Sequence, residues 1–437
     1  MTRLPEEFVS YTHGMMGDAL WARFREGMNS SPVVSIRLNP VKSGRFLPSR
    51  SLFAGEVHWC RQACYMSDRP NFTFDPLLHA GVYYVQEAAS MFIDEIIRQH
   101  VTSPVMMLDL CAAPGGKSTL LRSALPEGSL LVSNEPIRNR ANVLMENMQK
   151  WGMPDCLVTN NYPKDFRKTR LQFDLILCDV PCSGEGMFRK DPEAASQWSP
   201  RIVEKCQLLQ RDIVTEAWQC LRPGGKMIYS TCTFNTKENE ENIWWMMTQL
   251  GAEPLPMAIP PEWKVTGSLL KDFEAPVHRF IPGVTRGEGL FACVLRKPSG
   301  SEGQATPADK IRRTVGTSLN MLWDGLPPRA VIKGRDKVPS HAMALHVAQD
   351  LSTYPRVSLD YEQSVRFLRR ESLVLPPETP RGFVVVTFMG VPLGFVKNIG
   401  NRANNHYPES WKIKSTHIPD YEAILEPARP HTDGGHS

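Results

Sequence analysis

The sequence predicts an α/β protein built around a parallel, doubly wound sheet. The prediction rests on the region from residue 105 to residue 230, where short apolar runs alternate with longer amphipathic ones. The expected strands cover 105–110, 129–133, 173–178 and 226–230, and the expected helices cover 137–149 and 202–221. Strands that alternate with helices of this length form parallel sheets with helices on both faces. Ligands of such sheets bind beyond the carboxyl ends of the strands, so functional residues are expected there.

The regions around this sheet differ from it in composition. Residues 1–68 combine an expected helix (8–28) with a short strand (33–38), and the sheet region as a whole is expected to span 69–297. Residues 298–309 contain no large apolar side chain. They are therefore expected to form a linker.

Two further units and a tail are expected after the linker. Residues 310–378 include an expected helix (362–370) and should form a small α+β region. Residues 379–425 begin with an expected hairpin, in which strand-forming residues flank Met389-Gly390. Residues 426–437 are expected to be a disordered tail.

Charge is unevenly distributed along the chain. The formal net charge is +4, but residues 310–437 carry 17 Lys and Arg against 12 Asp and Glu, which is +5. The remaining residues carry 33 against 34, which is −1. A basic C-terminal part behind a neutral body fits a polyanionic partner, although an ordinary solvated surface would give the same count.

The sequence predicts neither a membrane segment nor a secretion signal. The longest apolar runs have the length of strands, and no apolar stretch follows the charges near the N-terminus. The cytoplasm is therefore the expected compartment. The ten cysteines of this long chain are expected to be reduced, and none has the C-x-x-C spacing of a zinc site, so no metal is expected.

The first strand of the sheet region runs into a loop of small residues. Residues 109–119 read DLCAAPGGKST, and the two adjacent glycines allow a ligand to approach the backbone closely. A dinucleotide fingerprint needs three spaced glycines, and a P-loop needs a glycine where Cys111 stands. Glu135 follows the second strand, where an acid can bind ribose hydroxyls or simply favour the next helix start. This arrangement favours a ribose-bearing ligand without strong phosphate recognition, such as S-adenosylmethionine.

Two other strand ends are followed by a cysteine. Asp179-Val180-Pro181-Cys182 follows one strand, and Thr231-Cys232 follows another. A single cysteine near a strand is most often a small core residue. Two thiols that lie beyond strands, among turn residues, and face the same cleft indicate chemistry instead.

Four motifs, taken in their order along the chain, resemble one family. YYVQEAAS (83–90), DLCAAPGGKST (109–119), DVPCSGEG (179–186) and STCTF (230–234) are similar to motifs of the Sun/RsmF-type RNA (cytosine-5)-methyltransferases. LPEEF (4–8) and PLGFVKNIGNRANN (392–405) resemble the RsmF branch, whose substrate is 16S ribosomal RNA. The resemblance spans almost the whole chain.

The resemblance implies a Rossmann-like S-adenosylmethionine-dependent methyltransferase domain. A small N-terminal α/β RNA-binding region would precede it, and C-terminal α+β and PUA-like RNA-binding regions would follow. Cys232 would be the nucleophile that attacks carbon 6 of a cytosine, and Cys182 would assist product release. The cofactor-binding residues implied by the family pattern are Cys111, Ala112, Ala113, Pro114, Gly115, Gly116, Lys117, Glu135 and Asp179.

The chain departs from the family at one position. Many members have an aspartate that contacts the adenine side of the cofactor after the third strand of the sheet, and Asn161 stands there in this chain. An asparagine can still donate and accept hydrogen bonds, but it carries no charge. A cofactor contact by Asn161 therefore stays an expectation.

The expected partner is RNA, bound by a monomeric protein. Ribosomal RNA or the small ribosomal subunit is the favoured substrate, tRNA is the second possibility, and a catalytically idle RNA-binding assembly factor is the third. Arg189 and Lys190, near the Cys182 motif, are candidates for phosphate contacts. So are eight basic residues of the C-terminal part: Arg366, Arg369, Arg370, Arg381, Lys397, Arg402, Lys412 and Lys414.

Overall fold

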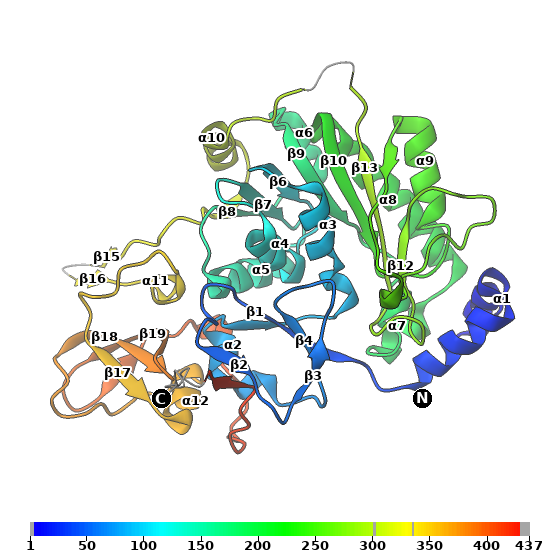
Figure 1. Cartoon of the computed structure of the whole chain (residues 1–437). Helices are drawn as coiled ribbons and strands as arrows, with labels where there is room; N and C mark the ends of the chain where they lie inside the picture. The colour runs from blue at the N-terminus through cyan, green and yellow to red at the C-terminus, as the bar shows by residue number, and fades with distance from the viewer. Residues whose placement is uncertain (1–3, 300–302, 334–335, 429–437) are drawn as a thin grey trace, which may run out of the picture.

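The central sheet contains all four strands expected from the sequence. Its parallel strands are β6 (Met106–Asp109), β7 (Leu130–Asn134), β8 (Cys156–Thr159), β9 (Phe173–Asp179) and β10 (Leu221–Thr231). Antiparallel strands extend it: β11 (Glu253–Leu255), β12 (His278–Phe280), β13 (Leu290–Arg296) and β14 (Met321–Trp323). This computed structural model describes residues 4–299, 303–333 and 336–428, and within them the sheet has nine strands in the order β11-β13-β10-β9-β6-β7-β8-β14, with β12 beside β13 (Figure 1).

Helices cover both faces of this sheet. The helices α3 (Ile93–His100), α4 (Gly116–Ala124) and α5 (Arg138–Trp151) pack on one face. The helices α6 (Pro163–Thr169), α8 (Pro200–Cys220), α9 (Glu240–Leu250) and α10 (Ala308–Ser318) pack on the other. Successive side chains of a strand point to opposite faces, so Leu175 and Leu177 of β9 enter the first core while Ile176 and Cys178 enter the second. The predicted doubly wound α/β fold is confirmed.

The N-terminal unit is an antiparallel sheet preceded by a long helix. The helix α1 (Glu6–Asn29) corresponds to the expected helix and is interrupted at Gly17, whose φ of 70° lies in the left-handed region. The sheet has the order β3-β4-β1-β5 and consists of β1 (Val34–Leu38), β3 (Phe53–Glu56), β4 (Ala63–Met66) and β5 (Tyr83–Val85). The short helix α2 (Pro76–His79) lies before β5.

A second four-stranded sheet forms the C-terminal unit. It has the order β17-β18-β19-β20 and consists of β17 (Arg356–Leu359), β18 (Gly382–Phe388), β19 (Val391–Asn398) and β20 (Ala403–Asn405). The expected hairpin is β18–β19, and the expected helix is α12 (Tyr361–Leu368). The sequence-based boundary between residues 378 and 379 runs through this sheet, because β17 pairs in parallel with β18. Hydrogen bonds between strands far apart in sequence are not visible in local patterns, so that boundary could not be placed correctly.

The segment between the two domains is more ordered than a linker. Helix α10 begins at Ala308, inside the expected linker. Thr306 exchanges two hydrogen bonds with Gln172, the residue before β9 of the central sheet. Beyond α10 lie β14, the hairpin of β15 (Val331–Lys333) and β16 (Asp336–Val338), and α11 (His341–Leu345). The part of the chain that joins the central sheet to the C-terminal unit is thus attached to the central sheet.

The N-terminal and C-terminal units share one hydrophobic core, although residues 86–355 separate their sheets in the chain. Ile36 and Phe72 from the first unit pack in one cluster with Val386 and Leu425 from the second. Strand β2 (Phe46–Pro48) also pairs with β21 (Leu425–Pro427), as Figure 1 shows at the bottom of the molecule. The expectation of a disordered tail is therefore wrong for its first two residues, which lie in β21, and residues 429–437 of that tail lie outside the described part.

Within the described residues, no helix has the length and the apolar character needed to cross a membrane.

The shared core predicts unequal effects of two leucine truncations on the same small sheet. Leu425→Ala in β21 removes a fully buried side chain (0% exposed) and should lower the free energy of unfolding by about 2–5 kcal/mol. Leu47→Ala in β2 removes a side chain that is 57% exposed and should change it by less than about 0.5 kcal/mol. Chemical denaturation of the full chain measures both values. Equal effects would contradict a shared core at this place.

Candidate active site

A cavity of about 600 Å³ opens at the carboxyl ends of β6, β9 and β10, the place where such sheets bind ligands. Its lining brings together the three segments singled out in the sequence, namely the small-residue loop and the segments that carry Asp179 and Cys232. The motif 83–90 and the segment 288–290 complete the wall. The lining residues are Tyr84, Val85, Gln86, Glu87, Ser90, Cys111, Ala112, Ala113, Pro114, Gly116, Lys117, Arg140, Asp179, Val180, Gly186, Met187, Cys232, Glu288, Gly289 and Leu290.

The loop after β6 is held in one shape by contacts at its turn. Gly115 has a φ of 114°, and a Cβ at this position would lie 3.3 Å from side-chain atoms of Leu144 and Asn147, so a larger residue does not fit. Asn147 donates a hydrogen bond of 2.8 Å from its Nδ2 to the carbonyl of Pro114, and Arg140 donates one of 3.1 Å to the carbonyl of Ala113. The backbone of the loop is therefore fixed before any ligand arrives.

A lysine and a carboxylate lie at the floor of the cavity. Lys117 Nζ donates to Asp179 Oδ2 at 2.9 Å, and Ser230 Oγ donates to the other carboxylate oxygen, Oδ1, at 2.7 Å. Burial lowers the pKa of Lys117. The Asp179 carboxylate and the Cys232 sulfur together raise it by more, so the net pKa is raised. Lys117 thus stays a cation beside both groups.

Asp109, at the end of β6, is a buried carboxyl that the sequence analysis did not single out. Its Oδ2 accepts a hydrogen bond of 2.6 Å from Ser118 Oγ, while its Oδ1 is buried without a partner. Burial raises the pKa of Asp109 to about 7, against the smaller lowering effect of the Ser118 hydrogen bond. The group therefore changes charge near neutral pH directly beneath the loop.

The two thiols lie 3.1 Å apart, measured between the sulfur atoms of Cys182 and Cys232. Their proximity follows from the pairing of β9 with β10, in which Asp179 stands opposite Ser230, so the segments after both strands emerge side by side. All ten cysteines are free thiols; seven are buried, and this pair and Cys206 are partly exposed. The pKa of Cys182 is raised well above its usual range, first by its hydrogen bond with Cys232 and then by burial.

Two buried carboxylates hold the segments that carry these thiols. Glu185 accepts hydrogen bonds from the backbone N–H groups of Phe234 and Asn235, at 2.7 and 3.0 Å, and so fixes the turn after Cys232. Glu238 accepts one of 3.0 Å from the backbone N–H of Ser183, and so fixes the turn after Cys182. Burial raises the pKa of Glu238 to about 7. The signal for this network in the sequence is the polar run after STCTF, whose residues are buried despite their polarity.

Aromatic side chains of α1 support the same segments from outside. Phe8 packs edge-on against Phe188 with ring centroids 5.1 Å apart, and Phe24 packs against Phe234 at 5.0 Å. The N-terminal helix thereby contacts the segments after both thiols.

Three of the predicted cofactor residues, Gly115, Glu135 and Asn161, lie outside the cavity lining. Glu135 is buried at the end of β7, where its Oε1 accepts a hydrogen bond of 3.0 Å from the backbone N–H of Ile137 and its Oε2 lies 3.6 Å from Arg140. The side chain of Asn161 pairs with the backbone of Asn320, accepting at 3.1 Å and donating at 3.4 Å.

The basic residues expected to contact phosphate are largely paired with acids in the structure. Arg189 is buried and forms an ion pair of 2.7 Å with Glu288, so it holds the cavity wall. In the C-terminal unit, Glu371 pairs with Arg366 and Arg369, and Glu409 pairs with Arg370 and Lys412.

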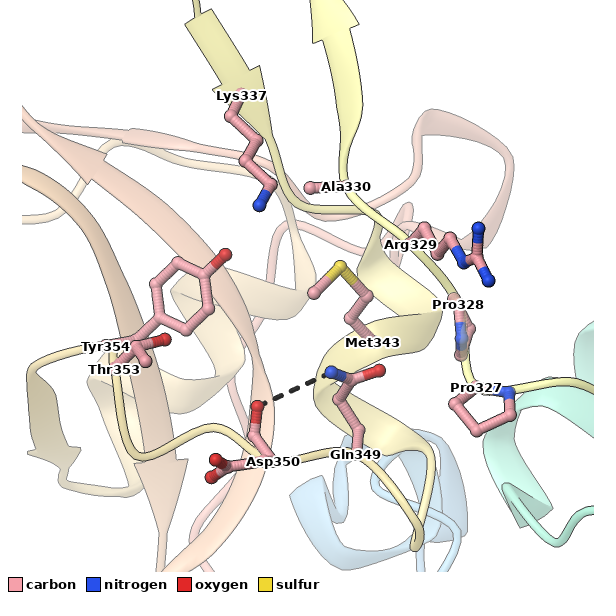
Figure 2. Close-up of a pocket in the computed structure, with 10 residues that line it drawn as sticks. All are labelled: Pro327, Pro328, Arg329, Ala330, Lys337, Met343, Gln349, Asp350, Thr353 and Tyr354. Atoms are coloured by element: carbon pink, nitrogen blue, oxygen red, sulfur yellow. Dashed lines mark hydrogen bonds between the residues drawn. The ribbon is translucent and has the colours of Figure 1, made fainter.

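A second cavity, of about 490 Å³, lies between the β15–β16 hairpin and the C-terminal unit. Figure 2 shows Lys337, Met343 and Tyr354 directed toward its interior, while the Arg329 guanidinium extends outward. It contains neither thiol nor any residue of the 111–117 loop. Among the described residues, no group of three His, Cys, Asp or Glu side chains is arranged to hold a metal ion.

The sheet order, the small-residue loop and the position of the cavity define a Rossmann-like methyltransferase domain. Two solved structures have a similar fold. NSun6 from Pyrococcus horikoshii with SFG is 19% identical with a TM-score of 0.56, covering 68% of this chain and 98% of that one. A methyltransferase homolog from the same organism is 22% identical with a TM-score of 0.53, covering 67% of this chain and 100% of that one. Three family models match: the N-terminal domain of 16S rRNA methyltransferase RsmF at residues 4–88, 16S rRNA methyltransferase RsmB/F at 100–296, and the methyltransferase RsmF PUA domain at 354–413.

Curated relatives give the particular family. The ribosomal RNA small subunit methyltransferase F of Shewanella loihica is 30% identical, covering 75% of this chain and 77% of its own length. The same enzyme of Cronobacter sakazakii is 28% identical, covering 86% of this chain and 89% of its own length. The chain belongs to the ribosomal RNA small subunit methyltransferase F family, and the resemblance seen in the sequence is confirmed.

Asp109 predicts a pH-dependent stability difference between the wild type and Asp109→Asn. The folded-state pKa of about 7 lies above the ordinary value of 3.8, so the contribution of Asp109 to stability is full below pH 4 and is lost as the pH rises through 7. The amide keeps the shape and does not ionise. The melting temperature of the variant relative to wild type should therefore rise between pH 5 and pH 8, as thermal denaturation across this range would show. A difference independent of pH would contradict the assignment.

Proposed function

We propose that this protein transfers a methyl group from S-adenosylmethionine to carbon 5 of a cytosine in 16S ribosomal RNA, through a covalent bond between Cys232 and the base. The observation that carries the proposal is the pair of thiols, 3.1 Å apart, beside a cavity that also contains Lys117 and Asp179. One thiol alone would suffice for a nucleophile. Two thiols in contact fit a reaction that must both add a sulfur to the base and remove it again.

The cavity fits S-adenosylmethionine by size and by the groups that it offers. Its volume of about 600 Å³ falls in the range of small-molecule sites, roughly 300–1,000 Å³. The φ of 114° at Gly115 strains any larger residue there, and six of the seven residues from Cys111 to Lys117 line the cavity. We assign cofactor binding to this loop and to Asp179, with Glu135 and Asn161 placed behind the wall. The bound cofactor supplies an electrophilic methyl group.

Cys232 is assigned the nucleophilic role because of the charges around it. Carbon 5 of cytosine is a poor nucleophile until a thiolate adds to carbon 6 and makes the ring enamine-like. Lys117, a cation, lines the same cavity as Cys232 and can compensate the negative charge of the attacking sulfur. Cys182, whose raised pKa keeps its proton, can donate a hydrogen bond to that thiolate.

Asp179 is assigned the contact to nitrogen 3 of the base. The carboxylate is held by Lys117 and Ser230, which fixes its position in the cavity wall. The carboxylate accepts a hydrogen bond from nitrogen 3 and so favours protonation of this nitrogen by solvent. The proton neutralises the electron pair that thiolate addition moves onto nitrogen 3, and it returns to solvent when the product forms.

Cys182 is assigned the removal of the proton from carbon 5. While Cys232 is free, the contact between the two sulfurs raises the pKa of Cys182. Once Cys232 has bonded to carbon 6, this cause is gone, and Cys182 can lose its proton to solvent more easily. Its thiolate then takes the proton of carbon 5, the C–H electrons restore the ring double bond, and Cys232 leaves as a thiolate.

RNA binding is assigned to the combined N-terminal and C-terminal units. They form one body through their shared core, and the matched ranges 4–88 and 354–413 fit the sheets better than a division at residue 379. We place the reaction in the cytoplasm, on naked ribosomal RNA or on the small subunit. The target cytosine must be unpaired or flipped out of a helix to reach the cavity.

The division of roles predicts different behaviour of two alanine variants. Cys232→Ala should abolish methyl transfer and leave RNA affinity unchanged. Cys182→Ala should form the bond to RNA but release it slowly, giving a protein–RNA complex that survives denaturing electrophoresis. Cys206→Ala, which removes the remaining partly exposed thiol, on α8, serves as the control. Full activity of Cys232→Ala, or an adduct in that variant, would show that the roles are assigned wrongly.

The substrate is tested in a strain that lacks the gene. Bisulfite sequencing should show loss of 5-methylcytosine at a single site of 16S ribosomal RNA, and expression of the wild type but not of Cys232→Ala should restore it. Loss at a tRNA position with intact ribosomal RNA would overturn the substrate assignment. Unchanged modification everywhere would favour an idle assembly factor.

A further inference from the structure

A short segment of the N-terminal unit reaches into the methyltransferase domain with three polar side chains. We name residues 37–42 (RLNPVK), which end strand β1 and continue past it, the bridging segment. Its polar members are Arg37, Asn39 and Lys42. Asn39 and Lys42 donate to the backbone carbonyls of Trp151, at 2.9 Å, and Lys150, at 2.6 Å, at the end of α5.

Arg37 reaches a different place, the first turn of the helix that follows the cofactor loop. Its Nη2 donates to Thr119 Oγ1 at 2.7 Å and to the carbonyl of Gly116 at 3.3 Å. Its Nε donates to Gln86 Oε1 at 2.9 Å. Gly116 and Gln86 both line the cavity assigned to the cofactor. Arg37 therefore supports that wall from behind without lining the cavity.

The environment of Arg37 is costly for a cation. The residue is 2% exposed, its hydrogen-bond acceptors are an amide, a carbonyl and a hydroxyl rather than a carboxylate, and its Nη1 is buried without a partner. Burial lowers its pKa to about 10, and the guanidinium lies 4.5 Å above the Trp151 ring. The Asp94 carboxylate acts on the guanidinium without a direct hydrogen bond and offsets only part of the effect of burial. A buried charge that is not paired directly is disfavoured in a core that serves stability alone. A planar guanidinium donates to several acceptors from one rigid fork, whereas the three donors of an ammonium leave a single nitrogen and an apolar side chain has no donor.

We propose that Arg37 is a positioning residue that sets the cofactor wall and couples it to RNA binding. Strand β1 lies in the sheet whose core is shared with the C-terminal unit. A shift of these joined units on RNA binding therefore moves Arg37, and with it Gly116 and Gln86. RNA binding then tightens cofactor binding, and by linkage the cofactor tightens RNA binding by the same factor. The inference rests on the proposed cofactor site and RNA surface, and it adds the connection between them.

The first test measures the affinity of S-adenosylhomocysteine by calorimetry, without any methyl transfer. Arg37→Met should weaken binding about ten-fold or more, because Gly116 and Gln86 lose the charged donor that holds them in the cavity wall. Arg37→Lys should restore part of the loss. Thr119→Val removes the acceptor of Arg37, together with the hydrogen bond of 2.8 Å that the same hydroxyl donates to the carbonyl of Gly115, with little change in shape. It should weaken binding several-fold, which keeps the test valid if Arg37→Met does not fold.

Asn39→Ala is the matched control. It lies in the same segment and is equally buried, but it contacts the carbonyls of Gly81 and Trp151 rather than the cofactor wall. It should lower the melting temperature and leave the affinity within about two-fold of wild type. If Asn39→Ala weakens binding as much as Arg37→Met, Arg37 has only a structural role and the inference fails.

The second test measures the same affinity with and without a saturating 16S ribosomal RNA transcript. The wild type should bind S-adenosylhomocysteine more tightly with RNA, and the ratio should fall to about one in Arg37→Met. A wild-type ratio of one, or an unchanged ratio in the variant, would refute the coupling while leaving the proposed reaction intact. A wild type that does not bind S-adenosylhomocysteine at all would instead refute the proposed cofactor site.

Discussion

The parallel pairing of β9 with β10 is the constraint on which the candidate site depends. Because Asp179 stands opposite Ser230 in this pairing, the next residues of both strands leave the sheet at the same edge. The two cysteines that follow, Cys182 and Cys232, therefore meet at 3.1 Å although 50 positions separate them in the chain. A shift of one residue would turn every side chain of a strand to the opposite face, so the two buried cores of the sheet fix this register.

Around the thiols the chain uses buried polar groups rather than apolar packing. Glu185, Asn235 and Glu238 satisfy one another and the backbone of both cysteine-bearing segments. Such a network is favourable only when all of its members are bonded, because an unpaired buried group loses its contact with water and gains nothing in return. The network therefore holds the two segments in one arrangement and leaves the sulfur atoms as the groups free to react.

Local patterns were enough to predict the central sheet and the place of the site. The apolar runs predicted strands β6, β7, β9 and β10, and the cysteines could be located at strand ends by counting alone. The shared core of the outer units could not be predicted, since Ile36 and Val386 meet only through tertiary contacts. For the same reason, nothing in the sequence indicated that Asn161 would bond to the backbone of Asn320 or that Arg37 would reach Thr119. Periodicity reports which face of an element is buried, and it does not report what that face meets.

Peptide mapping of a trapped adduct would identify the nucleophilic cysteine directly. RNA with 5-fluorocytidine at the target position lets the thiolate add and the methyl group transfer, but carbon 5 then has no proton to lose, so the protein stays bound to the base. Digestion and mass spectrometry identify the attached residue. We expect the adduct on Cys232, in the peptide that contains Thr231 and Thr233. An adduct on Cys182 would contradict it.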